Sequence, residues 1–88
     1  MGTNYLHYPL DLAKGQTVEV TLDNKANVRL LDEANFSYYK QGQQHRYIGG
    51  YAQKSPVRIT APRPGKWNLV VDLGGYPGIV RASVKVLN

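Results

Sequence analysis

Alternation between apolar and polar residues constrains the fold of this chain more than any other feature. Apolar residues recur at every second position in four segments, which are 17–22, 57–61, 66–73 and 80–86. Alternate residues of a β-strand point to opposite faces of a sheet, so each segment predicts a strand with one buried face. Shorter strand candidates are Tyr5–Leu10, Val28–Leu31 and Arg46–Tyr51.

Turn residues separate these segments. Asp23-Asn24-Lys25 predicts a tight hairpin between the second and third strands. Pro62 and Pro64 lack the backbone N–H that a strand ladder uses, so the chain must turn there. The glycine-rich stretch 74–78 predicts a hairpin loop before the last strand, because glycine adopts positive φ without strain. Gly49-Gly50 predicts a bulge or kink.

Helical sequence is nearly absent. Asp32 is a suitable N-cap, but two adjacent tyrosines and an asparagine propagate a helix poorly, so residues 32–39 predict a turn or a single short helix. The chain has 88 residues, which is enough for one domain, expected over 1–88. We therefore expect an all-β fold, a compact antiparallel β-sandwich of about seven strands, with a small Greek-key barrel as the alternative.

Positive charge is concentrated in the middle of the chain. Eleven Lys and Arg residues oppose six Asp and Glu residues, a net charge of +5, and no carboxylate occurs from Ala34 to Val71. This bias favours an anionic partner such as nucleic acid, a nucleotide, phosphate or acidic lipid. The alternative is a basic surface that serves solubility alone.

Several kinds of chemistry are not expected. The chain has no cysteine, so disulfides, thiolate metal sites and cysteine nucleophiles are excluded. His7 and His45 lie far apart in sequence, and the alternation around His7 predicts that it points to solvent. Asp72 is expected to bind amides of the following loop or to pair with Arg81. We expect no catalytic residues, no metal and no cofactor, and hence a protein that is not an enzyme.

Tyrosine is the richest feature. Four of the seven tyrosines lie between positions 38 and 51, mixed with cations and glutamines. A tyrosine ring beside a cation suits a protein interface, or stacking on a base while the charge meets a phosphate. The alternative is that half of the rings fill a core that is poor in Phe and Met. The candidate binding residues are Tyr38, Tyr39, Lys40, His45, Arg46, Tyr47, Tyr51, Lys54, Arg58, Tyr76 and Arg81.

Several motifs together resemble a known family. They include His45-Arg46-Tyr47 with Gly49-Gly50, Gly65 with Trp67, and Val71-Asp72-Leu73-Gly74-Gly75. The chain resembles the bacterial family of small proteins known as domain of unknown function number eighteen eighty-three, over nearly its whole length. The resemblance implies a small cytosolic β-rich domain, alone or attached to signalling domains of the TIR type. It implies no activity and no catalytic residues.

The sequence thus predicts a cytoplasmic, non-enzymatic binding or adaptor module that uses a basic, tyrosine-rich face for protein interaction. The alternative is binding of nucleic acid, a nucleotide or another anionic ligand. An enzyme is the third class and would need His45 or Asp72 in a closed pocket with a second titratable group. A membrane partner is not expected, and the chain is expected to be a monomer or a homodimer, since edge strands invite pairing.

Overall fold

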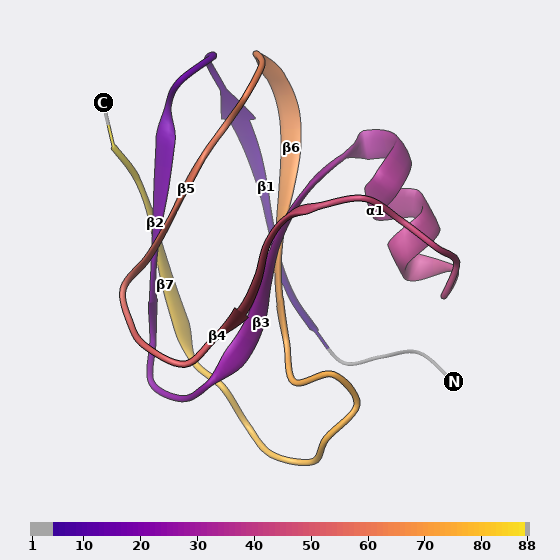
Figure 1. Cartoon of the computed structure of the whole chain (residues 1–88), viewed down its shortest axis with the longest axis vertical. Coiled ribbons are helices and arrows are strands. Elements are labelled where there is room, and N and C mark those ends of the chain that lie inside the picture. Colours follow the sequence, from indigo (N-terminus) through magenta and orange to yellow (C-terminus); the bar gives the residue numbers. More distant parts are fainter. Residues whose placement is uncertain (1–4, 88) are drawn as a thin grey trace.

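The computed structural model describes residues 5–87, so residues 1–4 and 88 of the expected domain lie outside the described part. Within it, the chain forms seven strands and one short helix (Figure 1). The elements are β1 (Tyr5–Leu12), β2 (Thr17–Leu22), β3 (Ala26–Asp32), α1 (Glu33–Lys40), β4 (Ile48–Ala52), β5 (Val57–Thr60), β6 (Gly65–Asp72) and β7 (Ala82–Leu87). The predicted all-β class and strand number are confirmed.

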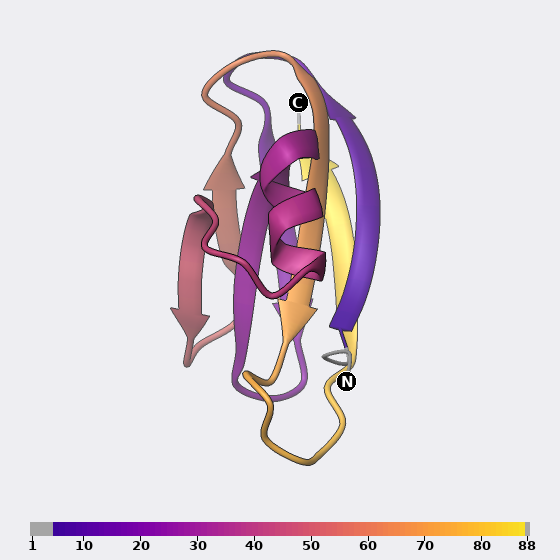
Figure 2. The ribbon, with the colours of Figure 1, turned by 90° about the vertical axis from the view of Figure 1, so that its right-hand side faces the viewer.

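Two antiparallel sheets face each other. One has four strands in the order β1-β6-β3-β4, and the other has three in the order β5-β2-β7. Helix α1 lies against the outer side of the four-stranded sheet, away from the second sheet (Figures 1 and 2). Across residues 5–87 the two sheets do not close into one ladder, so the sandwich is confirmed and the barrel alternative is wrong.

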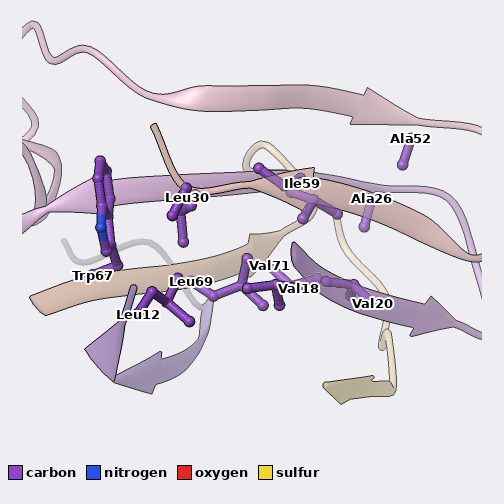
Figure 3. Packing of buried hydrophobic residues seen from close by; sticks show 12 residues of the cluster. Leu12, Val18, Val20, Ala26, Leu30, Ala52, Ile59, Trp67, Leu69 and Val71 are labelled. Carbon is purple, nitrogen blue, oxygen red and sulfur yellow. The ribbon is translucent and has the colours of Figure 1, made fainter. Parts of the chain in front are cut away.

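The core lies between the sheets and uses the predicted faces of the strands. Val18 and Val20 of β2 meet Leu69 and Val71 of β6 there, all with no exposed surface (Figure 3). Trp67 shares their face, as the alternation over residues 66–73 predicts, and is 4% exposed. Its indole N–H donates to a backbone carbonyl at 3.1 Å, which satisfies the polar atom of the buried ring.

The predicted hairpins are wrong, because both turns cross between the sheets. The turn 23–25 joins β2 to β3, which belong to different sheets, and the loop 73–81 likewise joins β6 to β7. Asp23 is tied to the second crossing loop: its backbone N–H donates to the carbonyl of Arg81, and its Oδ1 accepts from the N–H of Arg81 at 2.7 Å. Alternation shows which face of a strand is buried, but it does not determine which strand lies beside it in the sheet.

Helix α1 is the single short helix that the sequence allowed. The predicted N-cap is confirmed, because Oδ1 of Asp32 accepts from the backbone N–H of Asn35 at 2.8 Å. Phe36 of the helix is 8% exposed and packs on Leu31 and Val70, which the outer face of the sheet presents. Val70 breaks the alternation of its strand because the helix covers it. The helix thereby brings its last turn over the sheet next to the end of β6.

Candidate functional site

A buried carboxylate lies on the outer face of the four-stranded sheet. Asp72, the last residue of β6, is 2% exposed and pairs across the ladder with Asn27 of β3. Its Oδ1 accepts from the Asn27 side chain and from the backbone N–H of Gly74, each at 2.9 Å. Its Oδ2 accepts from the Tyr39 hydroxyl at 2.6 Å and from Nη1 of Arg29. A buried carboxylate is costly unless it is bonded and paired, and these four donors meet that need.

Arg29 of β3 lies between two tyrosine rings. Its guanidinium carbon is 5.6 Å from the ring centroid of Tyr39 and 5.1 Å from that of Tyr47. The side chain is 18% exposed, and its Nε is buried without a hydrogen-bond partner among residues 5–87. The ring faces attract the cation electrostatically, which compensates for part of its lost hydration. Tyr47, which is 44% exposed, therefore contacts a cation that Asp72 fixes in place.

Asp72 keeps its charge at neutral pH. Burial raises the pKa of Asp72, but the hydrogen bonds from Tyr39, Asn27 and Gly74 and the charge of Arg29 outweigh it, so the pKa lies below the ordinary 3.8. Burial, together with the neighbouring carboxylate, raises the pKa of the Tyr39 hydroxyl above its ordinary 10.0. The phenol therefore remains a donor, and the carboxylate remains an acceptor.

Acid should destabilise the protein through Asp72. Its pKa is lower when folded than when unfolded, so its contribution to the free energy of unfolding is fully present above the ordinary value of 3.8 and is lost as the pH falls further. Urea midpoints measured across this range should fall with decreasing pH in the wild type, and less steeply in Asp72→Asn, which has already lost that contribution. Parallel slopes in the two proteins would contradict the assignment.

His45 extends the aromatic arrangement. Its Nδ1 lies 2.8 Å from the carbonyl oxygen of Gln43, which only accepts, so Nδ1 carries a hydrogen. Its ring centroid is 5.3 Å from that of Tyr39, edge to face, and 5.6 Å from that of Tyr47. Nε2 is therefore the ring nitrogen left to meet a partner from outside.

Tyr51 completes this surface on the edge strand β4. It lies opposite Asn27 in the ladder and is 60% exposed. Tyr39 and Tyr47 thus flank a cation that Asp72 fixes from beneath, and Tyr51 lies on the same face of the sheet. We refer to this surface as the tyrosine–arginine face, which consists of Arg29, Tyr39, His45, Tyr47 and Tyr51.

The family model described as domain of unknown function (DUF1883) matches residues 3–88. The chain belongs to the DUF1883 family. The resemblance inferred from the motifs is thereby confirmed. No curated protein and no solved structure matches the chain.

The structure of this DUF1883 chain brings some of the predicted binding residues together. Tyr39, His45, Tyr47 and Tyr51 converge on the tyrosine–arginine face. Three others lie nearby without joining it. Tyr38 is 45% exposed on α1, the amine of Lys40 lies 4.7 Å from the Phe36 ring centroid, and Arg46 lines a small pocket beside Tyr47.

The remaining four predicted residues lie elsewhere. Lys54 is in the β4–β5 turn, and Tyr76 and Arg81 are in the β6–β7 loop. Arg58 is in the three-stranded sheet, where its Nη2 pairs with Glu19 at 2.9 Å. The structure therefore does not form one continuous surface from all the predicted residues.

Sequence reasoning missed Arg29 and Asn27. The predicted third strand began at Val28, so Asn27 fell outside it, and the outward position of Arg29 resembled an ordinary solvated site. The expected bond from Asp72 to a loop amide is confirmed at Gly74. The expected pairing with Arg81 is wrong, because the antiparallel register places Arg29 beside Asp72 instead.

Two hollows border α1. The smaller, of about 280 Å³, includes Arg46, Arg63 and Asp32 in its lining, and the latter two form an ion pair at 2.6 Å. The larger, of about 640 Å³, lies between α1 and β1. His7 lines it and is exposed as predicted, but its Nε2 also bonds Oδ1 of Asn68 at 2.8 Å.

Among residues 5–87, no three His, Asp or Glu side chains are grouped so that they could hold a metal ion. No helix in this range has the length and apolar character needed to cross a membrane.

Proposed function

We propose that this DUF1883 chain is a non-enzymatic binding module that recognises a protein segment through the tyrosine–arginine face. The observation that carries the proposal is the position of Arg29 between the rings of Tyr39 and Tyr47, with Asp72 bonded beneath. Rings that are fixed before binding lose little conformational entropy on binding. Tyr and Arg are also the residue types that contribute most to protein interfaces.

The charge distribution favours a protein segment over nucleic acid. Asp72 already balances the charge of Arg29, so the centre of the face offers contact area more than positive charge. Arg58 and Arg81, two of the predicted binding residues, lie away from it. A nucleic-acid site would need several free cations beside the rings to neutralise phosphates. Arg46 shares a pocket with Tyr47, but the amine of Lys40 lies over the Phe36 ring instead.

A random-peptide display library tests this function. The library is panned on the wild-type protein and counter-selected on Tyr47→Ala/Tyr51→Ala. Both rings are substantially exposed, so the variant should keep its fold. We expect enriched peptides that bind the wild type and lose about tenfold or more in affinity for Tyr47→Ala.

Arg58→Ala is the matched control, because it removes an exposed side chain from the other sheet and should leave peptide affinity unchanged. Failure to enrich any peptide that discriminates the double variant would count against the proposal. So would binding of single-stranded oligo(dT) that needs Tyr47 and weakens steeply with salt, because that result would identify the face as a nucleic-acid site.

A further inference from the structure

The β6–β7 loop carries the most exposed apolar side chains of the described residues. Tyr76 and Ile79 are each 79% exposed, on either side of Pro77. In both ribbon views the loop projects beyond the neighbouring β2–β3 turn (Figures 1 and 2). Water contact with such side chains is unfavourable, so a projecting apolar tip indicates a surface that is covered when the protein acts.

The base of this loop is fixed while its tip projects. The backbone N–H of Tyr76 donates to the carbonyl of Leu73 at 3.2 Å, and the two residues between them, Gly74 and Gly75, both have positive φ. Positive φ at both central positions is what a tight type I′ turn requires. The N–H of Gly74 also bonds the buried Asp72. The tip is thus presented from an ordered base.

Two other loops lie at the same end of the sandwich. Asp23 of the β2–β3 turn exchanges two hydrogen bonds with the backbone of Arg81, and Ser55 of the β4–β5 turn accepts from the N–H of Leu22 at 2.8 Å. These two loops and the β6–β7 loop carry the exposed cations Lys25, Lys54 and Arg81. Asp23 is the only carboxylate of residues 23–25, 53–56 and 73–81, and its Oδ1 is already bonded to the N–H of Arg81.

We propose that this end of the sandwich, defined by Lys25, Lys54, Tyr76, Ile79 and Arg81, binds the surface of an anionic lipid membrane. A tyrosine ring suits the interface between headgroups and acyl chains, and an isoleucine suits the acyl region just below. Cations around the insertion point attract anionic headgroups. The convex tip needs a partner that yields around it, and a bilayer does so without a preformed pocket. This inference follows the charge bias that favours acidic lipid, departs from the expectation that there is no membrane partner, and does not depend on the tyrosine–arginine face.

Vesicle sedimentation tests the proposal with the full chain. Vesicles of phosphatidylcholine alone are compared with vesicles that also contain phosphatidylserine. We expect binding that requires phosphatidylserine and weakens with added salt. Ile79→Ser should weaken it about tenfold, since the apolar anchor is lost. Arg81→Gln should weaken it about fivefold and leave the backbone bonds to Asp23 intact.

Matched controls separate the tip from the rest of the surface. Tyr38→Ser removes an exposed tyrosine from α1, and Lys85→Gln removes an exposed cation from β7; neither should change vesicle binding. Tyr76→Trp adds a fluorophore at the tip, whose emission should shift to shorter wavelength when phosphatidylserine vesicles are added. The only natural tryptophan, Trp67, is buried and should not respond.

Three results would overturn the proposal. One is no binding to phosphatidylserine vesicles even at low salt. Another is binding that Ile79→Ser and Arg81→Gln leave as strong as the controls do. The third is a tip that binds soluble oligo(dT) as tightly as vesicles, with no fluorescence shift from Tyr76→Trp, because the cations would then serve nucleic acid and no side chain would enter a bilayer.

Discussion

Asp72→Asn is expected to lower the free energy of unfolding by about 4 kcal/mol. The substitution removes the charge that compensates Arg29, whose side chain is 18% exposed and has its Nε buried without a partner. It also weakens the acceptor of the Tyr39 hydroxyl. A domain of this size is typically stable by about 5–15 kcal/mol, so the loss should be plain in urea denaturation followed by tryptophan fluorescence.

The exposed pair Arg58–Glu19 provides the matched control. Its partners belong to the other sheet, and the arginine side chain is 64% exposed. Exposed ion pairs contribute about 1 kcal/mol or less, so Glu19→Gln should cost no more than that. If the two substitutions cost the same, the Asp72 carboxylate does not act as a buried, compensated charge.

A double-mutant cycle would isolate the pair itself. Arg29→Met removes the cation together with its need for compensation, so Asp72→Asn should cost much less in an Arg29→Met background than in the wild type. The double variant should therefore be more stable than the sum of the single effects indicates. It should still bind selected peptides poorly, because the rings of Tyr39 and Tyr47 no longer flank a fixed guanidinium. The double variant would then regain stability without regaining peptide binding.

The faces of the strands could be predicted from the sequence. Val18 and Val20 alternate with polar residues and are fully buried, and Trp67 lies on the predicted side of its strand. Side-chain alternation is a local property of extended backbone, so it needs no knowledge of neighbours. The exception, Val70, becomes buried because α1 covers it. That contact depends on tertiary packing, which alternation does not describe.

Strand neighbours could not be predicted in the same way. Among residues 5–87, every direct link between consecutive strands crosses from one sheet to the other. Only β3 and β4 of this range, which are joined through α1, are both consecutive and paired. The residues 23–25 are compatible with a hairpin and with a crossing turn. The chain forms the crossing turn because β3 is buried as a central strand between β6 and β4, in the four-stranded sheet, whereas β2 belongs to the three-stranded sheet.

The aromatic rings of the candidate site could be predicted from the sequence, but the Arg29–Asp72 pair at its centre could not. The sequence placed Tyr39, His45 and Tyr47 close together because they are close along the chain. Arg29 and Asp72 are separated by 43 positions and meet through the register of β3 with β6. An outward arginine on a strand is ordinarily solvated, and nothing local distinguishes this one from the others.

Gly49→Ala is expected to cost about 4 kcal/mol and to disturb the tyrosine–arginine face. Gly49 has a φ of +118°, which side chains rarely adopt, and a Cβ there would lie 2.2 Å from the backbone oxygen of Val28 and 3.2 Å from Ile59. Backbone strain and overpacking each cost about 1–3 kcal/mol. A backbone atom cannot move aside as a flexible side chain can, so β4 must shift away from β3. Urea denaturation measures the cost.

Gly50→Ala is the control that separates strain from collision. Gly50 has a φ of +156°, and a Cβ there would meet nothing within 4 Å, so its substitution should cost only the strain, about 1–2 kcal/mol. The bulge predicted at this pair is wrong, since Gly49 and Gly50 stay in register opposite Arg29 and Val28, respectively; the alternative, a kink, stays a prediction. The glycines instead let β4 approach β3 closely enough for Tyr47 to reach the guanidinium. In Gly49→Ala, NMR shifts of Arg29 and Tyr47 should change together, whereas equal costs and unchanged shifts in the two variants would show that the close approach is not required.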